Sequence, residues 1–190
     1  MPMNIPFIEI PGNSLLYRIR TIDSSIKCES DLWYPPSEYI SKRGRLNEKN
    51  EPVLYAAEDI GTALAEMRIE VGQEFYLLFF KVIDPIKLID ISHSKGINSQ
   101  YKEVEEIVSS FLINEFSVLV TDEENARYRV SNLIGKFFYD YKCKNFDGWR
   151  YPSAVRSGEK STVSILKNAK KKWNFFLLPK GRWIQKLTIL

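Results

Sequence analysis

Short runs of apolar residues in the first half of the chain predict β-strands. Leu15–Ile19 is apolar and aromatic, with arginines alternating at positions 18 and 20, which is the period of a strand with one polar face. Val53–Ala57 predicts a short buried strand. Phe75–Ile83 is a nearly continuous apolar run, ended by Asp84 and Pro85, and predicts a central strand with a second one at Ile86–Ile91.

Apolar residues at helical spacing predict three helices. Asp59 is placed to cap a helix that begins at Ile60, and on its helical wheel Glu66 falls on the flank of the apolar stripe. Tyr101–Asn114 should form the second helix. Asn125–Tyr141 is the clearest amphipathic segment, and we interpret it as scaffold. Its apolar positions are Val130, Leu133, Ile134, Phe137, Phe138 and Tyr141.

Closing strands are expected toward the C-terminal end, at Thr162–Leu166, Phe175–Leu178 and Trp183–Ile189, with a turn at 179–181. Strands and helices interleave without an internal repeat or linker. The sequence therefore predicts one domain over residues 1–190, a mixed α/β (α+β) fold with a sheet core flanked by helices. A polar loop over Ser37–Pro52 is a segment of the kind that carries ligand contacts.

Composition restricts the class of protein. The chain is 44% hydrophobic and 27% charged, which is ordinary for a soluble globular protein, and no apolar run approaches the roughly 20 residues of a membrane span. The first ten residues lack the pattern of a secretory signal, so we expect a cytoplasmic protein. Cys28 and Cys143 fit reduced structural thiols better than a disulfide framework.

The charge balance does not favour nucleic acid as a partner. The net charge of +3 is small, although lysines 167, 170, 171 and 172 cluster near Trp173. A short lysine cluster is usually a solvated face, so nucleic-acid binding is not expected.

Most conventional catalytic sets are missing from this sequence. His93 is the single histidine, which rules out histidine pairs and multi-histidine metal sites, and its polar surroundings favour a surface loop over a catalytic triad. There is no glycine-rich fingerprint of the dinucleotide-binding fold and no phosphate loop. What remains is a set of arginine, tyrosine, glutamate and serine, which suits a polyanionic glycoside such as NAD used as a substrate.

Each residue of this set has a role in cleaving the bond between nicotinamide and ribose. The leaving group departs neutral, so the protein must mainly stabilise an oxocarbenium-like ribose, and Glu66 is the candidate. Arginine is the best partner for a pyrophosphate, which points to Arg45 and Arg18. Tyr55 can stack on the nicotinamide ring.

Each of these residues also has an ordinary structural interpretation. Glu66 could pair with Arg68 on an exposed helix, and Tyr55 could be a core tyrosine. Arg45 could be a solvated loop residue, and Ser153 could form a turn or a cap. The joint order and spacing of the set favour the functional interpretation.

The chain resembles the RES domain family, which is named for its arginine, glutamate and serine. The resemblance spans most of the chain. Its specificity lies in the ordered set of stretches, including the steps of ten residues from Arg45 to Tyr55 and eleven from Tyr55 to Glu66, and not in any single stretch. The stretches that carry it are Leu16-Tyr17-Arg18-Ile19-Arg20, Gly44-Arg45-Leu46-Asn47, Pro52-Val53-Leu54-Tyr55-Ala56-Ala57, Thr62-Ala63-Leu64-Ala65-Glu66 and Phe146-Asp147-Gly148-Trp149-Arg150-Tyr151-Pro152-Ser153.

The resemblance implies an ADP-ribosyltransferase-like fold and an enzyme that degrades NAD by hydrolysis or phosphorolysis, with no other cofactor. Arg18 and Arg45 would contact phosphates or ribose, and Tyr55 would line the nicotinamide side. Glu66 would stabilise the oxocarbenium, and Ser153 would help to orient the substrate. The family includes toxins of bacterial toxin–antitoxin pairs, so the partners it implies include NAD and a helix-turn-helix antitoxin. A second copy of the chain is a further candidate partner.

Two other functions stay open at the level of sequence. The same site could transfer ADP-ribose to a protein or a nucleic acid, since water, phosphate and a macromolecule each need access to only one face of the sugar. Alternatively, the chain could be a non-catalytic domain that binds a ligand or a partner, with the same residues serving only the structure.

Overall fold

The computed structural model describes residues 6–22, 26, 29–91, 102–118, 128–141, 146–156, 161–166 and 184–188. In this part of the chain, helices and strands interleave as a mixed α+β fold, as predicted. The strands are β1 (Phe7–Ile10), β2 (Leu15–Thr21), β3 (Val53–Ala57), β4 (Glu74–Lys81), β5 (Ile86–Asp90), β6 (Gly148–Pro152), β7 (Ser161–Leu166) and β8 (Ile184–Thr188). The α-helices are α1 (Ile60–Glu66), α2 (Lys102–Ser117) and α3 (Tyr128–Tyr141), with short 3-10 turns at Glu29–Leu32 and Ser37–Tyr39.

The strands form one sheet in the order β1-β5-β6-β7-β3-β2-β4-β8, antiparallel throughout except for the parallel pair β5 and β6. The sheet has a weak seam between β2 and β3. These strands share only the pair Tyr17 and Ala57, whereas β2 pairs with β4 along its whole length. Beyond that one pair β2 and β3 separate, which divides the sheet into two halves.

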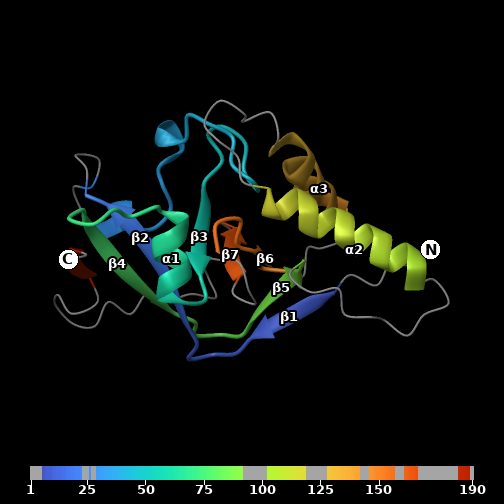
Figure 1. Ribbon diagram of the computed structural model, residues 1–190, viewed down its shortest axis with the longest axis horizontal. Helices are drawn as coiled ribbons and strands as arrows, with labels where there is room; N and C mark the ends of the chain where they lie inside the picture. Colours follow the sequence, from blue (N-terminus) through green and yellow to red (C-terminus); the bar gives the residue numbers. More distant parts are fainter. Residues whose placement is uncertain are drawn as a thin grey trace.

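The helices cover one face of this sheet. Thr162 of β7 contacts Glu66 of α1, and its cross-strand neighbour Tyr151 packs against Phe116 of α2. Directly paired residues point to the same face, so α1 and α2 lie on the same side. Figure 1 shows α1 over the boundary between β2 and β3, and α2, with α3 packed against it, over the half that contains β5 and β6.

Hydrophobic cores fill both faces. The face without α-helices is covered by Leu32, Trp33 and Tyr34. Below α2 the core is built around Phe116, which stacks on Trp149 at 5.9 Å between ring centroids. A third cluster lies under α1; its buried members are Ile19, Ala57, Ala63, Phe75 and Leu77.

Most elements were predictable from the apolar pattern. The expected strand Val53–Ala57 is β3 with the same bounds, and α1 begins at Ile60 with Asp59 as its cap. The strands β1 and β6 were not predicted, because neither has a clear apolar alternation of its own. The predicted strand Phe175–Leu178 and the turn at 179–181 lie outside the described residues.

The apolar stripe that predicts α3 packs only in part: Ile134 lies against the core around Phe116, but other members of the stripe are exposed. Val130, Leu133 and Phe137 are 41%, 69% and 53% exposed. The fully buried positions carry the small and polar residues Ser131 and Asn132, and Gly135, where a Cβ would lie 2.8 Å from Leu46 Cδ2. The reason is that α3 packs closely against the loop of residues 44–47. Ser131 and Asn132 donate hydrogen bonds to backbone carbonyls of this loop.

Within the described residues, no helix is both long and apolar enough to cross a membrane.

Candidate active site

A cavity of about 420 Å³ opens where β2 and β3 separate. Its walls include four of the five predicted site residues, namely Arg18, Arg45, Tyr55 and Glu66. The fifth, Ser153, lies behind Glu66 and touches its carboxylate. The volume is within the usual range for small-molecule sites. The fold therefore brings together residues that are up to 135 positions apart in the chain.

The carboxylate of Glu66 is held by hydroxyl groups. Its Oε1 accepts a hydrogen bond of 2.6 Å from Ser153 Oγ and one of 3.2 Å from Thr162 Oγ1. Among the described residues no donor contacts Oε2, and there is no ion pair between Glu66 and Arg68. One oxygen is thus anchored by the protein, and the other is available to a ligand.

Ser153 is oriented by the backbone that follows it. Its Oγ accepts hydrogen bonds from the amides of Val155, at 3.2 Å, and Arg156, at 3.0 Å. These two bonds occupy the lone pairs, so the single hydroxyl proton is directed at Glu66. Ser153 is only 7% exposed, which shields this arrangement from water.

The turn of residues 153–156 also stabilises the start of α1 through Arg156. Arg156 Nη1 donates to Asp59 Oδ1 at 2.6 Å and to Thr62 Oγ1 at 3.3 Å. Burial tends to raise the pKa of Asp59, but hydrogen bonds from Thr62 and Arg156 and the charge of Arg156 outweigh it and lower the pKa. A Cβ at Gly61 would lie 2.6 Å from Arg156 Nη1, so glycine permits the contact. The turn 153–156 therefore holds α1 at both ends.

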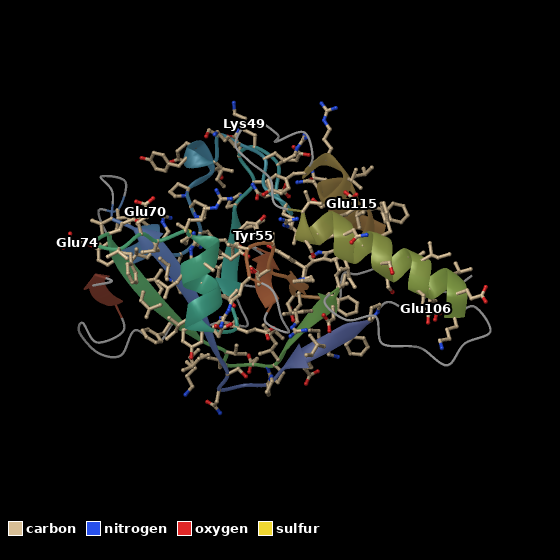
Figure 2. The ribbon with its side chains drawn as sticks, viewed as in Figure 1. Lys49, Tyr55, Glu70, Glu74, Glu106 and Glu115 are labelled. Atoms are coloured by element: carbon tan, nitrogen blue, oxygen red, sulfur yellow. The ribbon has the colours of Figure 1, made fainter. Side chains whose placement is uncertain are left out.

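Tyr55 fixes the loop that carries Arg45. Its hydroxyl accepts a hydrogen bond from the amide of Leu46 at 3.0 Å and donates to Asn47 Oδ1 at 2.9 Å. Burial, and then the neighbouring Tyr151, raise the pKa of Tyr55, so this hydroxyl stays protonated. A Cβ at Gly44 would collide with Asn47 Oδ1. In the view of Figure 2, Tyr55 lies between α1 and the C-terminal end of α2.

Arg45 is a buried residue, 8% exposed, and the interpretation as a solvated loop arginine is wrong. Its Nη1 donates to the carbonyl of Glu115 at 3.2 Å and its Nη2 to that of Val118 at 2.9 Å. These carbonyls belong to the C-terminal end of α2, where helix carbonyls lack intrahelical partners. The guanidinium lies 5.2 Å and 5.5 Å from the ring centroids of Tyr128 and Tyr151.

Arg18 has fewer partners than Arg45. Its Nη1 donates to the carbonyl of Trp33 at 2.7 Å. Burial, followed by the charge of Arg20, lowers the pKa of Arg18 to about 9, partly offset by Tyr34. Burial in turn raises the pKa of Tyr34 to about 12. Arg18 still carries its charge at neutral pH, without a carboxylate partner in the described part of the chain.

Comparison with protein families agrees with this constellation. The family model described as the RES domain matches residues 15–174, a stretch that contains all five predicted site residues. The chain belongs to the RES domain family. No curated protein matches its sequence.

Sequence reasoning missed several residues of this RES domain's site. Thr162 meets Glu66 only because β7 pairs with both β3 and β6, which places it beside Ala57 and Tyr151. No local signal could have shown this. Arg20, by contrast, also lines the cavity, and the alternating arginines of β2 were visible in the sequence.

Arg150, which lies within the RES motif that ends at Ser153, belongs to an internal ion cluster. Its Nε donates to Glu58 Oε1 at 2.5 Å, and its Nη1 to Asp90 Oδ1 at 3.2 Å. Burial lowers the pKa of Arg150, but the contacts with Glu58 and Asp90 outweigh it and raise the pKa. The cluster ties β3, β5 and β6 together. Among the described residues, no group of three histidine, cysteine or acidic side chains could hold a metal ion.

Proposed function

We propose that this RES domain cleaves the bond between nicotinamide and ribose in NAD, as a glycohydrolase or a phosphorylase. The observation that carries the proposal is Glu66, which lines the cavity with one carboxylate oxygen anchored by Ser153 and Thr162. An anchored carboxylate needs no reorganisation when positive charge develops beside it. The second oxygen is available for the oxocarbenium-like ribose or for a ribose hydroxyl.

The charge of the cavity supports an anionic substrate. Among the described residues, three arginines, Arg18, Arg20 and Arg45, line it, against the one carboxylate of Glu66. A dinucleotide brings negative charge in its diphosphate and positive charge in its nicotinamide ring, so it matches both groups.

Tyrosine rings supply a surface for the nicotinamide. Tyr17, Tyr55, Tyr128 and Tyr151 all line the cavity. A cationic ring stacked on a tyrosine is attracted by the negative face of the ring. Loss of the ring charge on cleavage weakens that attraction and favours release of neutral nicotinamide.

NAD is the substrate in this proposal, and no further cofactor takes part. The acceptor is water or phosphate. We extend the proposal to the biological role of a cytoplasmic toxin held inactive by a helix-turn-helix antitoxin, in keeping with the RES family match.

Incubation of the purified protein with NAD, with and without phosphate, tests the proposal. Chromatography should show free nicotinamide, together with ADP-ribose if water is the acceptor or its phosphorylated form if phosphate is. Label from NAD that stays bound to a macromolecule would instead identify a transferase. Intact NAD after prolonged incubation without any partner protein would contradict the proposal.

A further inference from the structure

Arg18 and Arg20 form a pair of like charges in the cavity wall. They are two residues apart in β2, so their side chains start from the same face, with Cα atoms about 7 Å apart. Both line the cavity, and the charge of Arg20 acts directly on Arg18. Two cations placed together in a partly buried site repel each other unless an anion lies between them.

The protein itself supplies no such anion in the described part of the chain. Arg20 makes no hydrogen bond or ion pair there, and Arg18 makes one bond to the carbonyl of Trp33. Two other arginines that donate hydrogen bonds inside the fold do have carboxylate partners: Arg150 pairs with Glu58 and Asp90, and Arg156 with Asp59. Arg18 and Arg20 therefore stand together in the cavity wall without a carboxylate partner among the described residues.

Arg45 has little donor capacity left to bind an anion in the cavity. Both of its terminal nitrogens already donate to carbonyls at the end of α2. All five N–H donors of the Arg20 guanidinium are still unused among the described residues. Two of them can donate bidentate hydrogen bonds to one anion. Of the three arginines in the cavity, Arg20 has the largest unused donor capacity.

We propose that Arg20, assisted by Arg18, binds the diphosphate group of the ligand. The resemblance to the RES family assigns phosphate contacts to Arg18 and Arg45, and Arg20 is a further binding residue. The assignment of the diphosphate to NAD rests on the proposed function, whereas the presence of a diphosphate site does not.

Calorimetric titration with inorganic diphosphate and with ADP tests the site without any turnover. Charge-assisted hydrogen bonds are about twice as strong as neutral ones. We therefore expect Arg20→Gln to weaken the binding of both probes by on the order of tenfold or more, and Arg20→Lys to restore part of it. Arg129→Gln removes an exposed arginine of α3 and should bind both probes like the parent protein. Equal binding by Arg20→Gln and the parent protein would overturn the proposal.

Thermal unfolding without ligand provides a second readout. Removal of one of two repelling charges should leave Arg20→Gln at least as stable as the parent protein, and diphosphate should stabilise the parent more than the variant. A variant that unfolds at lower temperature without ligand would show that Arg20 serves the fold, and would contradict the proposal.

Parallel assays of NAD cleavage separate this inference from the proposed function. Diphosphate binding that depends on Arg20 in a protein that leaves NAD intact would support the diphosphate site and refute the enzymatic role. Cleavage of NAD at equal rates and equal KM by the parent protein and Arg20→Gln would support the enzymatic role and refute the function of Arg20.

Discussion

At the scale of single residues, Glu66 shows how a common side chain acquires a special position. A glutamate at the end of a short helix is usually solvated or paired with a neighbouring cation. Here it accepts hydrogen bonds from two hydroxyl groups that belong to distant parts of the chain. Hydroxyl donors fix the direction of the carboxylate and leave its negative charge uncompensated, as stabilisation of a cation requires.

Replacement of Glu66 by glutamine should lower NAD turnover by on the order of a hundredfold or more, the scale of losing a preorganised transition-state contact. Glutamine keeps the shape and can still accept from Ser153, so the fold should persist. Steady-state kinetics of Glu66→Gln checks this, with Glu70→Gln at an exposed position as the matched control. Equal turnover by the two variants would remove Glu66 from the mechanism.

Ser153 and Thr162 should contribute unequally, because their bonds to Glu66 are 2.6 Å and 3.2 Å long. We expect Ser153→Ala to lower kcat by on the order of tenfold with little change in KM, since a hydrogen bond to a charged group contributes about 1.5–3 kcal/mol. Thr162→Val should lower kcat by less.

Thr162→Ser, which keeps the hydroxyl, should retain more activity than Thr162→Val. If instead Thr162→Ser were as impaired as Thr162→Val, or if Ser153→Ala changed only KM, the hydroxyl groups would not act by positioning Glu66.

At the scale of elements, the short helix α1 depends on contacts at both ends. Asp59 satisfies an amide of the first turn, as an N-cap does, and Arg156 lies against that turn. At the other end, Ser153 holds Glu66. A helix of two turns has little stability of its own, so these contacts and its packing on β2 and β3 determine its position.

Asp59→Asn should remove the ion pair with Arg156, and with it the pH dependence that this pair gives to the free energy of unfolding. The pKa of Asp59 is lowered in the folded protein from its ordinary value of 3.8. The stabilisation is therefore fully present above that ordinary value and is lost as the pH falls through the folded-state pKa. Asparagine still caps the helix but carries no charge.

Urea unfolding at several pH values measures this effect. The difference in unfolding free energy between the parent protein and Asp59→Asn should be largest at neutral pH and shrink in the acid range below the ordinary value. A difference that stays constant down to the lowest accessible pH would show that the charge of Asp59 does not contribute.

The loop of residues 44–47 is a second element whose position depends on contacts with other elements, here β3 and α3. Tyr55 binds its backbone from β3, and Ser131 and Asn132 bind it from α3. Contact with the loop backbone explains why α3 has small and polar residues at these buried positions. The loop in turn places Arg45 against α2.

Tyr55→Phe should destabilise the protein by about 1–3 kcal/mol, because the amide of Leu46 and the side chain of Asn47 would each lose a partner. The aromatic ring, and with it the cavity wall, would be retained. Thermal and urea unfolding check the loss. Tyr39→Phe, at a position 61% exposed, is the control and should unfold like the parent protein.

At the scale of the whole molecule, the site exists because the sheet is divided. The strands β2 and β3 join at Tyr17 and Ala57 and then separate, and the cavity occupies the space between them. One half of the sheet contributes Arg18 and Arg20, the other half contributes Tyr55, and the loop of residues 44–47 and α1 contribute Arg45 and Glu66. A ligand in the cavity thus contacts both halves of the molecule.

The order of the elements and the type of residue at each site position were determined by the sequence itself. Apolar runs specify β3, β4 and β5, and the cap at Asp59 specifies the start of α1, because these signals act between close neighbours in the chain. The spacing of Arg45, Tyr55 and Glu66 was sufficient for the RES resemblance, which the family comparison confirmed.

The relations between distant residues were decided only by the tertiary structure. Strand pairing brings Thr162 to Glu66, and helix packing converts Arg45 from a loop cation into a cap for α2. The buried positions Ser131 and Asn132 of α3 likewise depend on the loop that this helix contacts, since its apolar stripe gave no sign of them. Such contacts join residues from 70 to 96 positions apart, for which no local pattern exists, and so they follow from the packing of the sheet and its helices.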